Sequence, residues 1–102
     1  EVRLRVSEVD GVPLRFSNDL DIAADGRIYF TDSSRFSQPQ YMLDAFEARP
    51  HGRLIRYDPA TDRAAVLLDG LYFANGVALS HDDSFVLVNE TWRYRTLRLW
   101  LK

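Results

Sequence analysis

The chain has 102 residues, of which 46% are hydrophobic and 13% are aromatic, and its formal net charge at pH 7 is -2. This composition is typical of one soluble globular domain, and it excludes a disordered tail or a strongly basic nucleic-acid-binding arm. The chain contains no cysteine, which excludes disulfides and thiolate metal sites.

The sequence shows neither a membrane span nor a targeting segment. No apolar run approaches the ~18 residues that a membrane-spanning helix needs. The first ten residues lack the basic and then apolar order of a signal peptide. We therefore expect no membrane partner, and the cytoplasm is the default compartment for a chain whose location the sequence leaves unknown.

Eight β-strands are predicted in chain order. Apolar residues alternate with arginine and serine over Val2–Val6, which is the pattern of a half-buried strand. Two short apolar runs, Leu20–Ala24 and Arg27–Thr31, flank Asp25-Gly26, a strong hairpin signal because glycine tolerates positive φ. Further strands are predicted at Gly52–Tyr57, Ala64–Leu68, Val77–Leu79, Phe85–Val88 and Thr96–Leu101.

One segment, near residues 37–49, has a helical pattern. Ser37 is a candidate N-cap with Gln40 as its capping-box partner, and Pro39 lies in the first turn, where proline is tolerated. Pro50 prevents continuation of the helix. The predicted packed face consists of Tyr41, Met42, Ala45 and Phe46, with Asp44 and Glu47 pointing away. We expect a short amphipathic helix inserted between two strands.

The sequence contains an internal repeat. Residues 17–34 align with residues 74–91 without a gap at an offset of 57, which places Asn18 over Asn75, Ile28 over Phe85 and Phe30 over Leu87. Farther on, residues 53–57 align with residues 95–99 at an offset of 42. Repeats of roughly 40 to 50 residues with about four strands each are typical of β-propeller blades. The sequence therefore predicts an all-β fold made of propeller blades.

The strand count predicts how these blades are divided. With strands A to D counted outward from the propeller axis, residues 2–6 are a D strand, residues 20–68 a complete blade and residues 77–101 an A-B-C set. Unpaired strand edges favour association. We therefore expect homo-oligomerisation, with a trimer closing a six-bladed ring.

Three stretches together resemble the strictosidine synthase-like family of six-bladed propellers, which is related to the gluconolactonase, diisopropylfluorophosphatase and paraoxonase-like propellers. They are residues 17–34, residues 51–91 and the closing RYRTLRLWLK. The resemblance covers nearly the whole chain but only two of six blades. It implies a substrate pocket at one mouth of the central channel. It also implies activities that range from amine-aldehyde condensation to calcium-dependent ester and lactone hydrolysis. The catalytic glutamate of the plant synthases lies in a later blade, so the catalytic residues stay unknown.

The resemblance also implies candidate ligand residues. Asn18 and Asn75 match asparagines that reach an axial calcium ion in the related hydrolases, and each precedes an innermost strand. Amide oxygens suit Ca²⁺, which takes six to eight oxygen ligands. Asp19 could add a carboxylate, and His51, at the exit of the helical insertion, could contact substrate. The alternative is that both asparagines only form strand-entry turns.

Two functional hypotheses follow. The first is an enzyme acting on a small organic substrate, by ester or lactone hydrolysis or by amine-aldehyde condensation, and active only as an assembled propeller. The second is a non-catalytic propeller fragment that serves as a structural or binding module. Glu90 could be a general base if it faced the channel, although a rim position suits its place in the strand pattern better. A serine hydrolase triad lacks a G-x-S-x-G elbow, and the basic and aromatic C-terminus is interpreted as an ordinary strand, so no nucleic-acid partner is expected.

Overall fold

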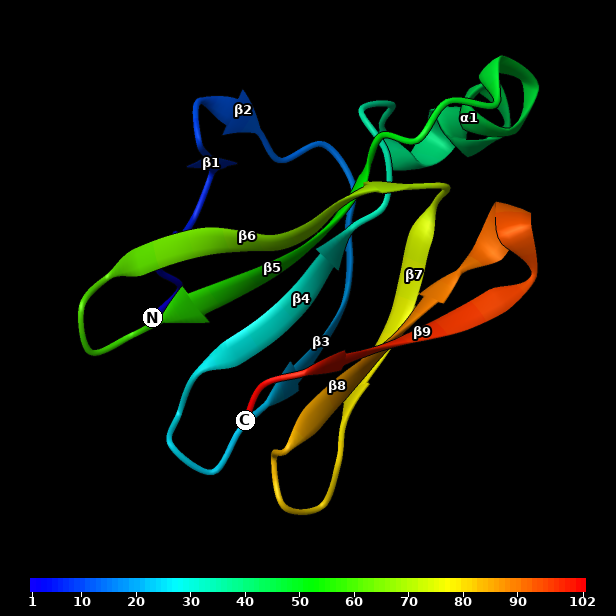
Figure 1. The fold of residues 1–102 in the computed structure, drawn as a ribbon. Coiled ribbons are helices and arrows are strands. Elements are labelled where there is room, and N and C mark those ends of the chain that lie inside the picture. The colour runs from blue at the N-terminus through cyan, green and yellow to red at the C-terminus, as the bar shows by residue number, and fades with distance from the viewer.

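A computed structural model describes all residues, 1–102. It contains antiparallel sheets of two, four and three strands together with one short α-helix, α1 (Figure 1). The strands are β1 (Glu8–Val9), β2 (Val12–Pro13), β3 (Ser17–Ile22), β4 (Ile28–Asp32), β5 (Gly52–Asp58), β6 (Arg63–Leu71), β7 (Ala74–Leu79), β8 (Phe85–Glu90) and β9 (Arg95–Trp100). The helix is α1 (Tyr41–Glu47), preceded by the 3-10 turn η1 (Gln38–Gln40), and a second 3-10 turn, η2 (Thr91–Arg93), follows β8.

The two larger sheets are the predicted propeller blades. The first has the order β3-β4-β5-β6 and the second the order β7-β8-β9, so each is a meander in which consecutive strands pair. The A-B-C-D blade and the following A-B-C set are therefore confirmed. In Figure 1 the two sheets fan out side by side, and β3 and β7 lie next to each other.

The two blades share one hydrophobic core. Val77 pairs with Val88 across the second sheet, so both side chains lie on the same face. That face meets the first blade, where Leu54 is fully buried. The same core includes Ala23, Tyr29, Leu71, Ala74 and Val86. Burial of these apolar faces, at about 25 cal/mol per Å², is what holds one blade against the next.

Carboxylates of the first blade also bond the backbone of the second. Asp19 accepts the Leu20 N–H through Oδ1 (2.9 Å) and the Val77 N–H through Oδ2 (3.0 Å). Asp21 makes the same kind of bridge two residues later, to the N–H of Leu79 (2.8 Å). These N–H groups belong to the free edges of innermost strands, so the carboxylates satisfy donors that the ladder leaves unpaired.

The strand expected over Val2–Val6 is not formed. Val2 and Leu4 are 100% and 83% exposed, and the first pairing is the short hairpin of β1 and β2. A D strand needs a neighbouring C strand, and in this chain β5 is already paired with β6. The alternating pattern therefore describes a segment that has no sheet to join here.

The helical insertion is confirmed, but its orientation differs from the prediction. The predicted inner face is largely in solvent: Phe46 is 80% exposed and Tyr41 is 47% exposed. Asp44, predicted to point outward, is only 1% exposed and accepts hydrogen bonds from the Ser34 hydroxyl and the Trp92 indole N–H (2.7 Å). A buried carboxylate with two donors, rather than an apolar stripe, attaches α1 to the blades.

The repeat slips by one residue at the hairpins. Leu20 pairs with Phe30 in the first blade, whereas Val77 pairs with Val88 in the second. Phe30 therefore corresponds to Val88, not Leu87, and by the same one-residue slip Ile28 corresponds to Val86, not Phe85. The last pair before the turn is Ile22 with Ile28 in the first blade but Leu79 with Val86 in the second, so one residue more lies between the paired residues there. A gapless sequence match therefore becomes a shifted structural match.

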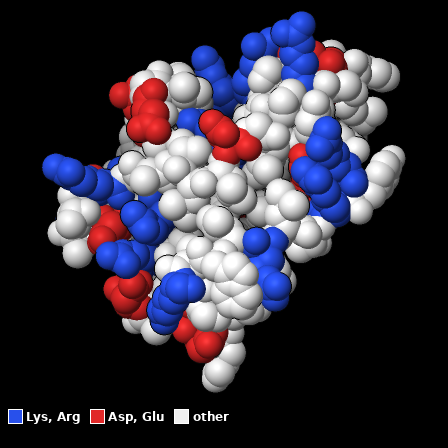
Figure 2. Space-filling view, viewed as in Figure 1, with Lys and Arg blue, Asp and Glu red and all other residues white.

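Charged side chains are spread over the surface. Figure 2 shows basic and acidic residues interspersed on the face in view. No helix of the structure has both the length and the apolar character that crossing a membrane requires.

Candidate functional site

Asn18 and Asn75 meet at the joint between the blades. Asn18 lies in β3 and Asn75 in β7, and these innermost strands are neighbours. Nδ2 of Asn18 donates to Oδ1 of Asn75 at 2.9 Å. The structure thus brings together the two asparagines that the repeat aligned.

Each asparagine is held by a hydroxyl of its own blade. The Asn18 amide also donates to Oγ of Ser33 (3.0 Å), and the Asn75 amide donates to Oγ1 of Thr91 (3.1 Å). Ser33 and Thr91 each follow strand B of their blade, directly after β4 and β8. Two blades of different sequence therefore build the same support.

A buried acid precedes each of these hydroxyls and pairs with an arginine from the next strand. Asp32 receives the Arg53 guanidinium at 2.7 Å, and Glu90 receives Arg95 at 2.6 Å. Both acids also accept backbone N–H groups just before the inner strand, for example from Phe16 (2.8 Å). These bonds fix the chain that leads into each asparagine.

The pKa of Glu90 predicts a pH effect on stability. Burial acts to raise this pKa, but the Tyr72 N–H and the Arg95 guanidinium outweigh it, and the pKa lies below its ordinary value of 4.5. Ionised Glu90 therefore contributes stability that is fully present above about pH 4.5 and is lost as the pH falls through the lowered pKa. Urea unfolding of wild type and Glu90→Gln is measured between pH 7 and pH 3, and the difference in their free energies of unfolding should become smaller as the pH falls. A difference that does not change with pH would contradict the role given to ionised Glu90.

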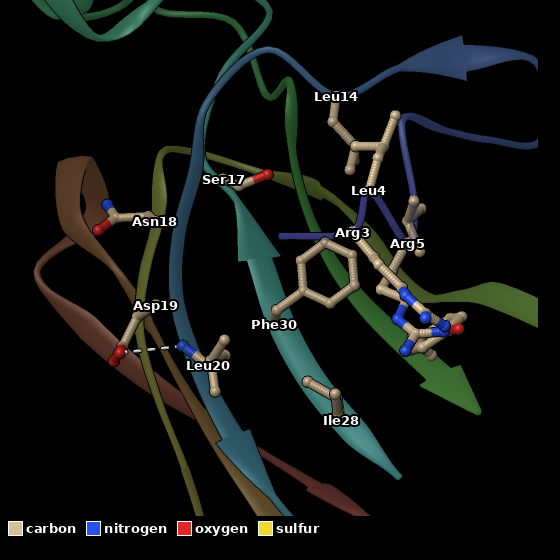
Figure 3. Close-up of a pocket in the computed structure, with 12 residues that line it drawn as sticks. Arg3, Leu4, Arg5, Leu14, Ser17, Asn18, Asp19, Leu20, Ile28 and Phe30 are labelled. Atoms are coloured by element: carbon tan, nitrogen blue, oxygen red, sulfur yellow. Dashed lines mark hydrogen bonds between the residues drawn. The ribbon is translucent and has the colours of Figure 1, made fainter. Parts of the chain in front are cut away.

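Asp19 lies next to the pair, but its carboxylate is occupied. Both of its oxygens accept the backbone N–H groups described above. In Figure 3 the Asn18 and Asp19 side chains lie on the opposite side of β3 from Phe30, and all three residues belong to the lining of an open cavity of about 360 Å³. In this chain Asp19 joins the blades, and its role as a ligand residue stays a prediction.

His51 is not part of this cluster. Its Nε2 lies 2.7 Å from Oε1 of Glu47, one helical turn back, and no hydrogen bond links it to either asparagine. The hydrogen bond from His51, together with Arg35 and Arg49, lowers the pKa of Glu47 against an opposing effect of burial. His51 closes the end of the helical insertion.

The other residues considered from the sequence have structural partners. Glu90 is 1% exposed and bonded on both oxygens, so it does not face an open channel as a base. Ser34 bonds Asp44, and Ser33 bonds the Ala74 carbonyl, so no serine is paired with His51. The triad is not assembled.

The asparagine pair offers oxygens of the kind that Ca²⁺ takes but does not complete a calcium site. No group of the chain donates to Oδ1 of Asn18, and Oδ1 of Asn75 keeps a second lone pair after accepting one bond. Two neutral oxygens fall short of the six to eight that Ca²⁺ requires. The chain also contains no cluster of three or more histidine, cysteine, aspartate or glutamate residues able to hold a metal.

Sequence reasoning found the asparagines but not their supports. Ser33 and Thr91 were not aligned, because the gapless match placed Ser33 over Glu90. Shifting the alignment by one residue after the hairpin superposes an acid followed by a hydroxyl in both blades, Asp32-Ser33 and Glu90-Thr91. That shift was the available signal.

Comparison with known proteins decides the family. The family model described as strictosidine synthase matches residues 18–102, which include both asparagines and both support residues. The chain belongs to the strictosidine synthase family. The resemblance carried by the repeat and the closing stretch is thereby confirmed.

Curated proteins of a plant and of a mammal are similar to this chain. Protein STRICTOSIDINE SYNTHASE-LIKE 10 of Arabidopsis thaliana is 53% identical over 98 residues, which are 94% of this chain and 26% of that protein. Adipocyte plasma membrane-associated protein of Mus musculus is 46% identical over 95 residues, which are 91% of this chain and 23% of that protein. The chain thus spans about a quarter of the length of the curated relatives it matches.

A solved structure described as a gluconolactonase shares the fold of this family member. It superposes with a TM-score of 0.73 at 23% sequence identity, over 96% of this chain and 33% of that one. At this level of identity the likeness concerns the fold alone. It confirms that the two sheets are β-propeller blades, and two blades cover a third of that propeller.

Proposed function

We propose that these two blades belong to a propeller enzyme acting on a small organic substrate, in which Asn18 and Asn75 supply part of a polar ligand site at the inner edge. The observation that carries the proposal is the asparagine pair itself. Two blades that differ in sequence hold their asparagines with the same hydroxyl, acid and arginine arrangement. A strand-entry turn alone does not require an amide oxygen that is left open.

The site needs further blades to become a pocket. Leu20 and Ile22 are 56% and 57% exposed, although their counterparts Val77 and Leu79 face the neighbouring blade. In a closed ring another blade covers Leu20 and Ile22 and adds its own inner-strand residues to the axis. These blades come from further sequence of the same polypeptide or from further copies of this chain, and three copies would complete six blades.

Calcium is the ion we propose for this site. When bound, it would supply Lewis acid chemistry by polarising a carbonyl oxygen of an ester or lactone. The chain's own contribution is to present two amide oxygens whose side chains are held by hydrogen bonds to each other, to Ser33 and to Thr91. Ester or lactone hydrolysis is therefore the proposed reaction type, and amine-aldehyde condensation is the activity that the family name brings to the proposal.

A non-catalytic structural or binding module is the second candidate. The acids that surround the pair are all engaged. Asp19, Asp32 and Glu90 use both carboxylate oxygens in bonds to backbone N–H groups or arginines. No free carboxylate is left at the inner edge of these blades to act as a base.

The mass in solution tests ring closure by copies of the chain. Size exclusion with light scattering should give about three times 11.8 kDa if three copies close the ring. A folded monomer contradicts the three-copy ring and assigns the remaining blades to other sequence.

Turnover separates the two candidate functions. The assembled propeller is assayed against aryl esters and lactones with Ca²⁺ and with a chelator, and in parallel with tryptamine and an aldehyde. Asn75→Ala should abolish calcium-dependent hydrolysis, whereas the matched control Asn89→Ala, a change at an exposed asparagine outside the pair, should not. Hydrolysis that is indifferent to Asn75→Ala, or no turnover of any substrate, favours the non-catalytic module.

A further inference from the structure

We infer that Ser33 is the positioning residue that sets the direction of both asparagine amides and leaves Oδ1 of Asn18 as an open acceptor. The open Asn18 oxygen therefore selects a cation or a hydrogen-bond donor, not an anion. The ligand in this inference rests on the proposed function, whereas the geometry rests on hydrogen bonds within this chain. Ser33 is fully buried, so its bond to the Ala74 carbonyl is shielded from competing water.

A group of fixed polarity sets the orientation of the Asn18 amide. The backbone carbonyl of Ala74 can only accept, so Ser33, whose Oγ bonds it, must donate its single proton there. The Ser33 oxygen can then only accept from Asn18. The atom of Asn18 that faces Ser33 must therefore be Nδ2 and not Oδ1.

The same polarity passes to the second asparagine. Nδ2 of Asn18 uses its other proton on the side-chain amide of Asn75, so the atom of Asn75 that receives it must be Oδ1. Nδ2 of Asn75 is then directed to Thr91. The Thr31 hydroxyl, also fully buried, donates to the backbone carbonyl of Asn75 at 2.7 Å and fixes that residue against the first blade. One carbonyl thus determines two amide orientations.

The outcome is that the open atom of the Asn18 amide is an acceptor. Both protons of the Asn18 amide nitrogen are used inside the chain, and its oxygen receives none. An amide oxygen carries partial negative charge and two lone pairs. A cation, or an N–H or O–H group of a ligand, is bound there favourably, whereas a carboxylate or phosphate would meet an oxygen of like sign.

Exchange of side-chain amide protons with water tests the role of Ser33. In ¹H–¹⁵N spectra of the full chain, Ser33→Ala should speed exchange of the Asn18 amide protons about 5-fold, the effect expected when one net hydrogen bond is lost. Ser33→Thr should restore slow exchange, since threonine stands at the equivalent place in the second blade. The exposed Asn89 amide is the internal control, and the backbone spectrum reports whether each variant is folded. Unchanged exchange at Asn18 in a folded Ser33→Ala variant overturns the inference.

Two ions then test the polarity of the site. In the assembled propeller, calcium chloride should shift the Asn18 side-chain carbonyl signal, and sodium phosphate at equal ionic strength should not. The calcium shift should fall several-fold in Ser33→Ala, where the amide is free to turn. A shift with phosphate and none with calcium overturns the selectivity. Slow exchange that depends on Ser33, without any calcium shift, counts against calcium in the proposed function and supports the positioning role.

Discussion

Arg53→Met is expected to lower the free energy of unfolding by about 3–5 kcal/mol, the range found when one partner of a buried ion pair is removed. The Arg53 side chain is 9% exposed and that of Asp32 is 4% exposed. The substitution would leave the Asp32 carboxylate buried without its cation. It would also free the carbonyls of Val9 and Val12, which the guanidinium bonds in the β1–β2 hairpin. Urea unfolding followed by circular dichroism measures the loss.

Two control variants test whether the loss of stability in Arg53→Met comes from the buried ion pair. Arg49→Met removes an arginine that is 70% exposed and should change stability by less than about 0.5 kcal/mol. Asp32→Asn added to Arg53→Met removes the uncompensated charge while keeping an oxygen for the Phe16 N–H, and it should recover part of the loss. An Arg53→Met variant as stable as wild type would show that the ion pair of Arg53 and Asp32 does not hold the β1–β2 hairpin.

Leu54→Ala is expected to cost about 2–5 kcal/mol, as large-to-small substitutions in tightly packed cores do. Leu54 is fully buried in the core cluster that includes Val77 and Val88 of the second blade. The cavity would therefore open at the joint between blades. Unfolding of both blades should remain one transition that moves to lower urea, because a single core serves both.

Leu4→Ala is the matched control. Leu4 is 83% exposed and belongs to no strand, so its truncation should be nearly neutral. Separate transitions for the two blades in Leu54→Ala, or equal effects of the two substitutions, would contradict a shared core at the joint.

The strands from residue 17 onward were predictable because local signals agree there. The turns at Asp25-Gly26 and Asp58-Pro59 separate successive apolar runs, and Gly26 adopts the positive φ that such a turn favours. Alternation then assigns faces, and the 57-residue repeat assigns the blades. Sequence and structure agree where each strand has a neighbour within the chain.

The failures have different physical causes. The pattern of Val2–Val6 is a strand pattern, but strand formation requires a partner that these residues lack. The helix was oriented by its apolar stripe, whereas the buried contacts of Asp44 with Ser34 and Trp92 decide its orientation. Pairing over 48 residues, from Asp44 to Trp92, leaves no periodic trace in a sequence.

The two asparagines of the candidate site were predictable from the sequence, but the residues that support them were not. Asn18 and Asn75 stand out because the repeat aligns them before an inner strand. Ser33 was concealed by the one-residue slip at the hairpin, since register depends on turn geometry that sequence alignment does not contain. The orientation of the two side-chain amides follows only from the hydrogen bonds that link Ser33, Asn18 and Asn75, and the sequence does not contain them.

The central claim is that the Asn18 and Asn75 side chains form one bonded unit across the joint between the blades. A double-mutant cycle on the free energy of unfolding tests it most directly, with Asn18→Ala, Asn75→Ala and the double variant. The predicted coupling is about 0.5–1.5 kcal/mol, because the second substitution removes a bond that the first has already broken. Strictly additive losses would contradict the claim.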